Sequence, residues 1–173
     1  MNKLNELSEI GFRITWKVMN IGLFGAQNIP AQLSRLELFE YLNQLLYFEY
    51  EQLDHVIELI FEWEDECKAD KILHTLAEND GSNFAIQLRK WRAYLLKHLL
   101  DNISHDSLQG LLELMEFWTS VGISNDCPHI FPAQNNSLSV QDYFSDSMYT
   151  KLKDINQTWL INEIAGIIKL ENS

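Results

Sequence analysis

Residues 49–66 read EYEQLDHVIELIFEWEDE, a stretch in which apolar and acidic residues recur with the period of an α-helix. The apolar residues fall at helical spacing, as on one side of a helix: Leu53, Val56, Ile57 and Ile60. The acids recur every three or four positions, which places them along one opposite stripe: Glu51, Asp54, Glu58, Glu62 and Asp65. The stretch therefore predicts an amphipathic helix with an acidic face.

Helical signals continue on both sides of this stretch. Ser34 and Glu37 form a capping box, in which each side chain satisfies an otherwise unpaired backbone N–H and opens a helix. No stretch shows a stronger β-strand pattern than the short one at Phe12–Trp16. A break between two helices is expected around Tyr47–Glu49. Apolar spacing and breakers predict the remaining elements at 15–24, 34–46, 69–77, 83–101, 106–121 and 147–169, with a short turn at 139–143.

The fold class that these patterns predict is all-α, a compact domain of about six to eight helices. The 173 residues fit one domain, 1–173, because a chain of this length buries roughly 70% of its unfolded surface. Alternating short helices are also compatible with a helical repeat array, although no period of about 20–50 residues with matching anchor residues is found.

The charge of the chain is unevenly distributed. Its formal net charge is −12, and ten acids lie between Leu36 and Cys67 without a single Lys or Arg. Nucleic acids and anionic membrane surfaces attract cationic proteins, so the net negative charge of this chain disfavours both as partners. A basic protein is the natural electrostatic complement.

The expected location is the cytoplasm. The first residues contain acids and no apolar run that would serve as a signal peptide, and no stretch approaches the roughly 20 apolar residues that span a bilayer. The two cysteines, Cys67 and Cys127, form no Cys-x-x-Cys motif. No cofactor-binding fingerprint is present, so no cofactor is expected.

The acidic stripe is the first candidate site. Like charges at helical spacing repel one another, so a helix that needed only solubility would mix in Lys or Arg. One interpretation is an ordinary solvated face, contacted internally by the basic run at 89–97. The other is a landing surface for a basic protein, with Trp63 or Tyr50 as an aromatic anchor. The predicted contact acids are Glu51, Asp54, Glu58, Glu62, Glu64, Asp65 and Glu66.

Catalytic and metal sites are the remaining candidates. Di-iron helical proteins use Glu-x-x-His, whereas this chain has only the reverse, His55-x-x-Glu58, so no metal site is expected. Cys127 and His129 are two residues apart and could pair as nucleophile and base. However, no third, orienting group is identifiable, and a packed loop explains the same residues.

Several segments resemble a family of small acidic bacterial proteins that is known only as a domain of unknown function. They are FWTSVGISNDCPHIFP at 117–132, NNSLSVQDYFS at 135–145, TWLINEI at 158–164 and ITWKVMNIGL at 14–23. The resemblance is sharpest around Trp118–Phe144. Members of that family are suspected to be immunity proteins of polymorphic toxin systems, so the resemblance implies a chain that blocks a toxin.

The sequence thus predicts a non-catalytic binding protein of the immunity type, which neutralises a basic toxin, such as a nuclease, through an acidic helical surface. A helical scaffold or regulatory adaptor is the first alternative, and an enzyme built on Cys127 and His129 is the second. The oligomeric state stays open.

Overall fold

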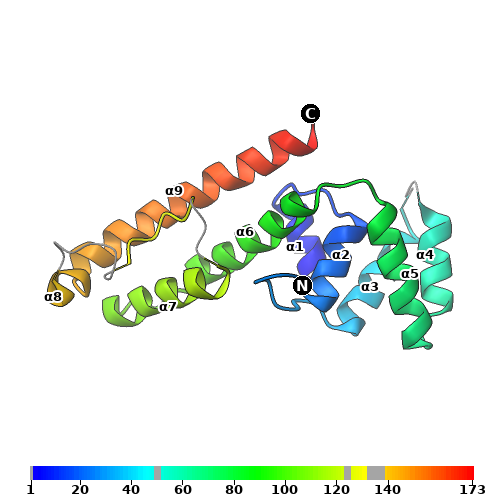
Figure 1. Ribbon diagram of the computed structural model, residues 1–173, viewed down its shortest axis with the longest axis horizontal. Helices are drawn as coiled ribbons and strands as arrows, with labels where there is room; N and C mark the ends of the chain where they lie inside the picture. Colours follow the sequence, from blue (N-terminus) through cyan, green and yellow to red (C-terminus); the bar gives the residue numbers. More distant parts are fainter. Residues whose placement is uncertain (1, 49–51, 123–125, 132–138) are drawn as a thin grey trace. The chain divides into compact units, whose positions relative to one another are not determined.

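The computed structural model describes residues 2–48, 52–122, 126–131 and 139–173. Within them it contains nine helices and no β-strand, which confirms the all-α prediction (Figure 1). The chain consists of two compact units, and the boundary between them lies within α6, between Trp91 and Arg92. The expectation of one domain therefore stays a prediction. The helices are α1 (Lys3–Glu9), α2 (Trp16–Phe24), α3 (Arg35–Leu45), α4 (Leu53–Phe61), α5 (Glu66–Asn79), α6 (Phe84–Asn102), α7 (Ser107–Ser120), α8 (Val140–Tyr143) and α9 (Asp146–Glu171).

Local capping signals place several helices where the sequence predicts them. Thr15 caps α2, and its hydroxyl accepts a hydrogen bond from the Val18 N–H. Ser34 and Glu37 make both hydrogen bonds of the predicted capping box at the start of α3. Ser139 caps α8 in the same way. These helices begin as expected because a cap needs only residues that are close in the sequence.

The structure differs from the sequence analysis at two places. No helix was predicted before residue 15, but Asn2 caps α1, which buries Leu4 and Leu7 completely. The acids from Glu51 to Asp65 were predicted to lie along one helical stripe, but α4 ends at Phe61. The chain then turns, and the Asp65 side chain caps the next helix by accepting a hydrogen bond from Lys68 N–H. The carboxylate of Asp65 therefore starts α5 instead of continuing a face of α4.

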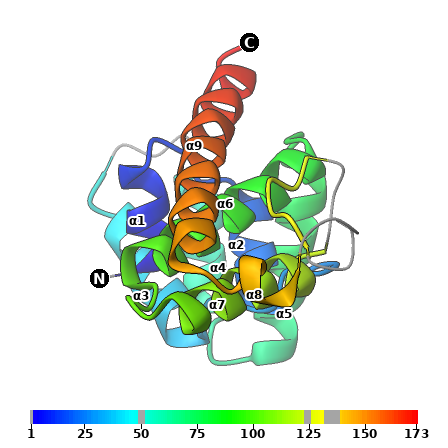
Figure 2. The ribbon, with the colours of Figure 1, turned by 90° about the vertical axis from the view of Figure 1, so that its left-hand side faces the viewer.

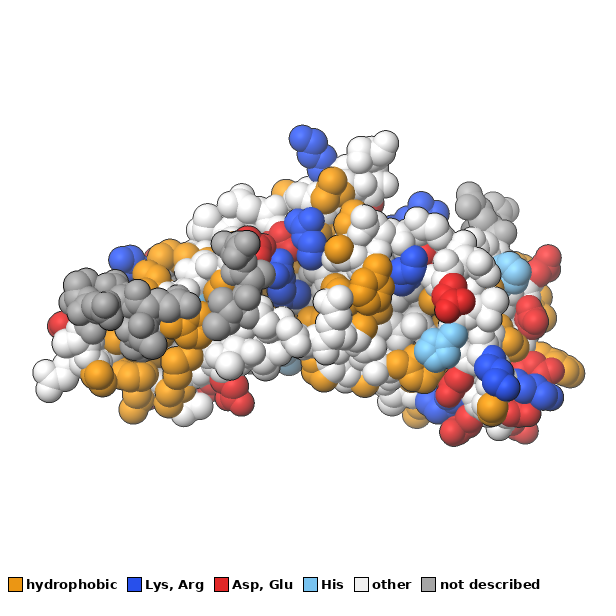
Figure 3. All heavy atoms as spheres, viewed as in Figure 1, with side chains coloured by type: hydrophobic (Ala, Val, Ile, Leu, Met, Phe, Trp, Pro, Cys, Tyr) orange, Lys and Arg blue, Asp and Glu red, His pale blue; other side chains and the backbone are white. Residues whose placement is uncertain are grey.

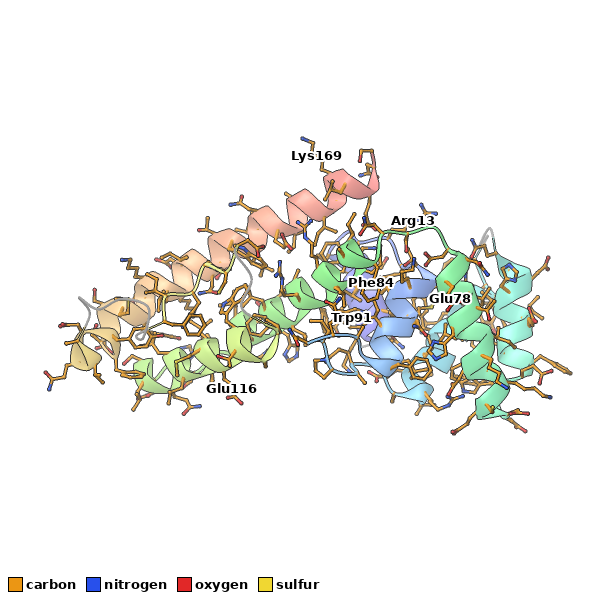
Figure 4. All side chains as sticks on the ribbon, in the orientation of Figure 1. Arg13, Glu78, Phe84, Trp91, Glu116 and Lys169 are labelled. Atoms are coloured by element: carbon orange, nitrogen blue, oxygen red, sulfur yellow. The ribbon has the colours of Figure 1, made fainter. Side chains whose placement is uncertain are left out.

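Unit 1, residues 1–91, is a set of short helices around one core. Helix α2 packs against α3 and α5, and α4 packs against the same two helices. Trp91 of α6 is fully buried, and its indole N–H donates to the Val18 carbonyl at 3.0 Å (Figure 4). A β-carbon on Gly22 would lie 2.5 Å from the Trp91 ring, so this close contact between α2 and α6 requires glycine.

Unit 2, residues 92–173, is organised by its longest helix. Figure 2 shows α9 as one uninterrupted helix from the end of α8 to the C-terminus. Helix α7 packs along α9, and the buried Trp118 indole donates to the Asn156 amide oxygen at 2.6 Å. The Tyr149 hydroxyl of α9 donates to the Ser104 carbonyl at 2.6 Å. The Trp118 indole and the Tyr149 hydroxyl therefore both find acceptors within the same unit.

No helix in the described part of the chain combines the length and apolar character that crossing a bilayer requires.

Candidate functional site

One side of α4 carries four exposed residues that we call the α4 face: Asp54, Ile57, Glu58 and Phe61. Their positions at i, i+3, i+4 and i+7 place them together on one side of the helix. Ile57 is 50% exposed and Phe61 is 83% exposed. The spacing of Ile57 suggested that it lies on the buried side of the helix, but its side chain is exposed. The α4 face therefore combines carboxylates with large apolar side chains.

The other side of α4 anchors it to unit 1. Val56 and Leu59 are completely buried, where α4 packs against α3 and α5. The turn after α3 adds two more exposed aromatic side chains, Tyr47 and Phe48. Figure 3 shows acidic and apolar side chains intermixed over the α4–α5 region. A buried side thus fixes the helix while its outer side stays in solvent.

Four of the acids between Leu36 and Cys67 have partners within the chain. Lys3 pairs with Glu37 at 2.8 Å, and Arg35 lies 3.7 Å from Glu66. Burial opposes ionisation of Glu37, but hydrogen bonds from Lys3 and Ser34 outweigh it and lower the pKa of this carboxyl.

Lys68 forms ion pairs with two acids, Glu62 and Asp65. Its ammonium lies 3.2 Å from Glu62 and 3.5 Å from Asp65. The hydrogen bond to Glu62 and the charges of both carboxylates raise the pKa of Lys68. Glu62 and Asp65 therefore belong in part to the internal structure of the turn between α4 and α5.

Other predicted contact acids have no such compensation. Among the described residues, no Lys or Arg lies within salt-bridge distance of Asp54, Glu58 or Glu64, and all three are exposed. Glu58 has only His55, with 4.0 Å between Oε2 and the imidazole Nδ1. Glu51 lies outside the described residues. Within the Leu36–Cys67 stretch, the exposed described acids for which no Lys or Arg partner is shown are thus Glu40 on α3 and Asp54, Glu58 and Glu64 on and just after α4.

The predicted aromatic anchor Trp63 is held inside unit 1. Its ring stacks on Phe39 with 5.6 Å between centroids, and the Arg35 guanidinium lies 4.8 Å above its face. Arg35 is fixed in turn by Asp70 at 2.5 Å. Trp63 therefore connects α3 to the turn after α4, and the exposed aromatic side chains described in this region are Tyr47, Phe48 and Phe61. The other proposed anchor, Tyr50, lies outside the described residues.

The basic run at 89–97 makes its identified contacts elsewhere. Lys90 is buried and donates to the Arg13 carbonyl at 2.6 Å, and Lys97 pairs with Asp101. Arg92 pairs with the buried Glu163 at 3.1 Å. The ion pairs shown for the described acids between Leu36 and Cys67 are made by Lys3, Arg35 and Lys68.

The second candidate, Cys127 with His129, lies in a buried environment. His129 is 4% exposed, and its Nε2 lies 2.9 Å from the Tyr143 hydroxyl. Burial lowers the pKa of His129 to about 4 and raises the pKa of the Cys127 thiol. Burial thus disfavours both the thiolate of Cys127 and the imidazolium of His129, the charged forms that an activated Cys–His pair uses.

Disulfides and clustered metal ligands are both absent from the described residues. Cys67 and Cys127 are both free thiols. No group of three or more His, Cys, Asp or Glu side chains is placed so that it could hold a metal ion within the described ranges. The pair of His55 and Glu58 supplies two possible ligands, fewer than a dedicated metal site uses.

Comparison with protein families gives one match. A family model described as an uncharacterized protein conserved in bacteria (DUF2247) matches residues 4–164. The chain belongs to this family. The match to DUF2247 confirms the bacterial family of unknown function that the sequence resembled. No curated protein and no solved structure matches the chain.

Membership of DUF2247 assigns no activity to any residue, because the family description names none. The match runs from α1 into α9 and so includes both units of the chain. The side chains themselves have to indicate the function, and the α4 face is an exposed group of them that combines charge with apolar surface.

Proposed function

We propose that the chain is a non-catalytic binding protein that neutralises a basic protein in the manner of an immunity protein. The observation that carries this proposal is the α4 face together with Glu64: exposed carboxylates without lysine or arginine partners, next to exposed Ile57 and Phe61. Such a surface supplies both charge and apolar area to a partner. We place its action in the cytoplasm.

The exposed carboxylates of α4 affect the free chain as well as the proposed complex. Asp54 and Glu58 are one turn apart, and like charges at this spacing destabilise a helix by a few tenths of a kcal/mol. A basic partner removes that repulsion. Complementary charge also raises the association rate and disfavours partners of the wrong sign.

A nuclease toxin is the partner class that fits best. A nuclease needs a basic surface to hold phosphates, and an acidic protein competes for that same surface. Covering the surface blocks the substrate without any chemistry by the blocking protein. The buried, neutral His129 and the protonated Cys127 support the non-catalytic part of the proposal.

An adaptor is the second candidate, and exposed apolar side chains away from the acids favour it. Leu108 and Leu112 of α7 are one turn apart and 50% and 37% exposed. Binding through such a surface would depend little on salt, because apolar contacts are not screened.

Capture from cells of the source bacterium, followed by a growth assay, tests the proposed function. The wild-type chain is expected to retain a basic protein that inhibits growth when expressed alone and is harmless when co-expressed with this chain. The variant Asp54→Lys, Glu58→Lys, Glu64→Lys should not protect. A variant with the same charge change elsewhere is the control: Glu9→Lys, Glu116→Lys, Asp154→Lys.

The control should protect as well as the wild type. Equal protection by both triple variants would show that the acids on and after α4 are not the binding surface. Capture of only neutral or acidic proteins would contradict the proposed function itself.

A further inference from the structure

The α4 face presents two large apolar side chains to solvent, one helical turn apart. Phe61 is 83% exposed and Ile57 is 50% exposed, although α4 already buries Val56 and Leu59 on its inner side. Grouped apolar side chains on a surface that polar residues border are a feature of protein interaction sites. Helix α4 is thus apolar toward the core of unit 1 and apolar again toward solvent.

The four residues of the α4 face form two short rows. Ile57 and Phe61 are separated by one helical turn, and so are Asp54 and Glu58. A turn rises about 5.4 Å, so an apolar row and an acidic row run side by side at the same spacing. A partner that matches both rows needs apolar and cationic groups that repeat once per turn.

We infer that the α4 face binds an amphipathic, lysine- or arginine-bearing helix of the partner protein. Helices dock through apolar anchors at i and i+3 or i+4, which is the spacing of Ile57 and Phe61. Cationic residues beside those anchors would pair with Asp54 and Glu58, for which the described part of the chain shows no lysine or arginine partner. This inference rests on the proposed function and names the element of the partner that is bound.

Charge decides against the other occupants of such a face. A second copy of this chain would bring Asp54 and Glu58 against identical carboxylates across a two-fold axis. Those charges repel, and the pairs would have to be desolvated. Anionic lipid headgroups carry the same unfavourable sign. The partner helix is therefore cationic and belongs to another protein.

The aromatic residue that is available to a partner is not Trp63, the anchor that the sequence suggested. The ring of Trp63 already stacks on Phe39 and makes a cation–π contact with Arg35. Phe61, two residues earlier, makes no aromatic or cation–π contact among the described residues. Of the two, Phe61 has the free apolar surface that a partner can bury.

A peptide titration with the full chain tests the inference. The probe is a fluorescent peptide of about 18 residues, or about five helical turns, with Leu at i, i+3 and i+4 spacing and Lys elsewhere. A scrambled peptide of the same composition and an all-lysine peptide are compared with it. The variants are Ile57→Ser with Phe61→Ser, and, as a matched control on α9, Ile161→Ser with Leu170→Ser.

The amphipathic peptide should bind the wild type at least about tenfold more tightly than the scrambled one, since only the former presents an apolar row. The Ile57→Ser, Phe61→Ser variant should lose at least about tenfold in affinity, and the control variant should lose none. Circular dichroism should be the same for all variants, because the four replaced side chains are exposed.

Two results would overturn the inference, and they differ in what they say of the proposed function. If scrambled and amphipathic peptides bound equally and the Ile57→Ser, Phe61→Ser variant bound like the wild type, charge alone would carry binding. The proposed function would then stand without a helix-binding face. If none of the cationic peptides bound, the helix-binding face and the electrostatic basis of the proposed function would both be lost.

Discussion

The α4 face and the Cys127–Phe131 segment carry the two most suggestive side-chain combinations of the chain, and their environments are opposite. The α4 face leaves Asp54 and Glu58 in solvent without lysine or arginine partners. The Cys127–Phe131 segment places His129 against Tyr143 and Phe131, where burial keeps the imidazole neutral. Reactive residue types that are buried in this way stabilise a fold, whereas ordinary acids that are exposed and unpaired can bind.

The contrast shows which property of a residue decides its use. A thiol near an imidazole suggests catalysis only when the thiol can ionise, and burial raises the pKa of Cys127 instead. Carboxylates suggest binding only when the chain does not neutralise them, and Lys68 already pairs with Glu62 and Asp65. Environment therefore separates candidate residues that the sequence presents as equals.

The largest expected effect on stability is in the Cys127–Phe131 segment. His129→Ala removes a buried ring and leaves the Tyr143 hydroxyl without its partner, which should lower the free energy of unfolding by about 2–3 kcal/mol. Phe61→Ala should change it by less than about 0.5 kcal/mol, because the ring is 83% exposed. Urea unfolding of both variants measures the difference. The comparison fails if Phe61→Ala is the more destabilising of the two.

The pH dependence of stability gives a second, smaller contrast. The pKa of His129 is about 4 in the folded chain, against an ordinary value of 6.5. Between these values the unfolded chain binds a proton that the folded chain does not, so this contribution to stability is complete above pH 6.5 and is lost as pH falls toward 4. From pH 7 to 5 the wild type should lose about 2 kcal/mol through this group.

His129→Gln should flatten that dependence, since glutamine does not titrate. The Asp54→Lys, Glu58→Lys, Glu64→Lys variant retains His129 and should keep the wild-type slope. Denaturant titrations at pH 7, 6 and 5 measure all three chains. A wild-type slope in His129→Gln would contradict the assignment of this effect to the buried histidine.

Thiol reactivity gives the third contrast, at a single-residue level. Cys67 is exposed at the start of α5, whereas Cys127 is half-buried with a raised pKa. Iodoacetamide at pH 7.5 should therefore alkylate Cys67 at least about tenfold faster than Cys127, because only the thiolate reacts. Mass spectrometry of timed samples follows both sites. Faster alkylation of Cys127 would revive the catalytic interpretation.

Local sequence signals predicted much of the fold. Caps by Thr15, Ser34 and Ser139 depend on neighbours three residues away, and the helices that they open lie where the sequence placed them. Helix α1 was missed, although Asn2 followed by Leu4 and Leu7 is a weak form of the same signal. The acidic stripe was overextended because periodicity alone does not reveal the turn after Phe61.

The candidate site was predictable only in part. Charge density identified Asp54, Glu58 and Glu64, which the structure leaves exposed. The contact between Arg35 and Trp63 joins residues that are distant in the sequence, so nothing local showed that Trp63 was occupied. Ile57 and Phe61 were not singled out as anchors, because helical spacing alone does not show which apolar residues of α4 contact the core and which contact solvent.

The most direct test of the central claim is the salt dependence of binding to the captured basic protein, measured by calorimetry from about 50 to about 300 mM salt. The wild-type affinity should fall steeply with salt. The Asp54→Lys, Glu58→Lys, Glu64→Lys variant should bind at least about tenfold more weakly, with a flatter dependence and an unchanged Tm. An unchanged affinity together with a lowered Tm would show instead that these carboxylates stabilise the fold and do not bind a partner.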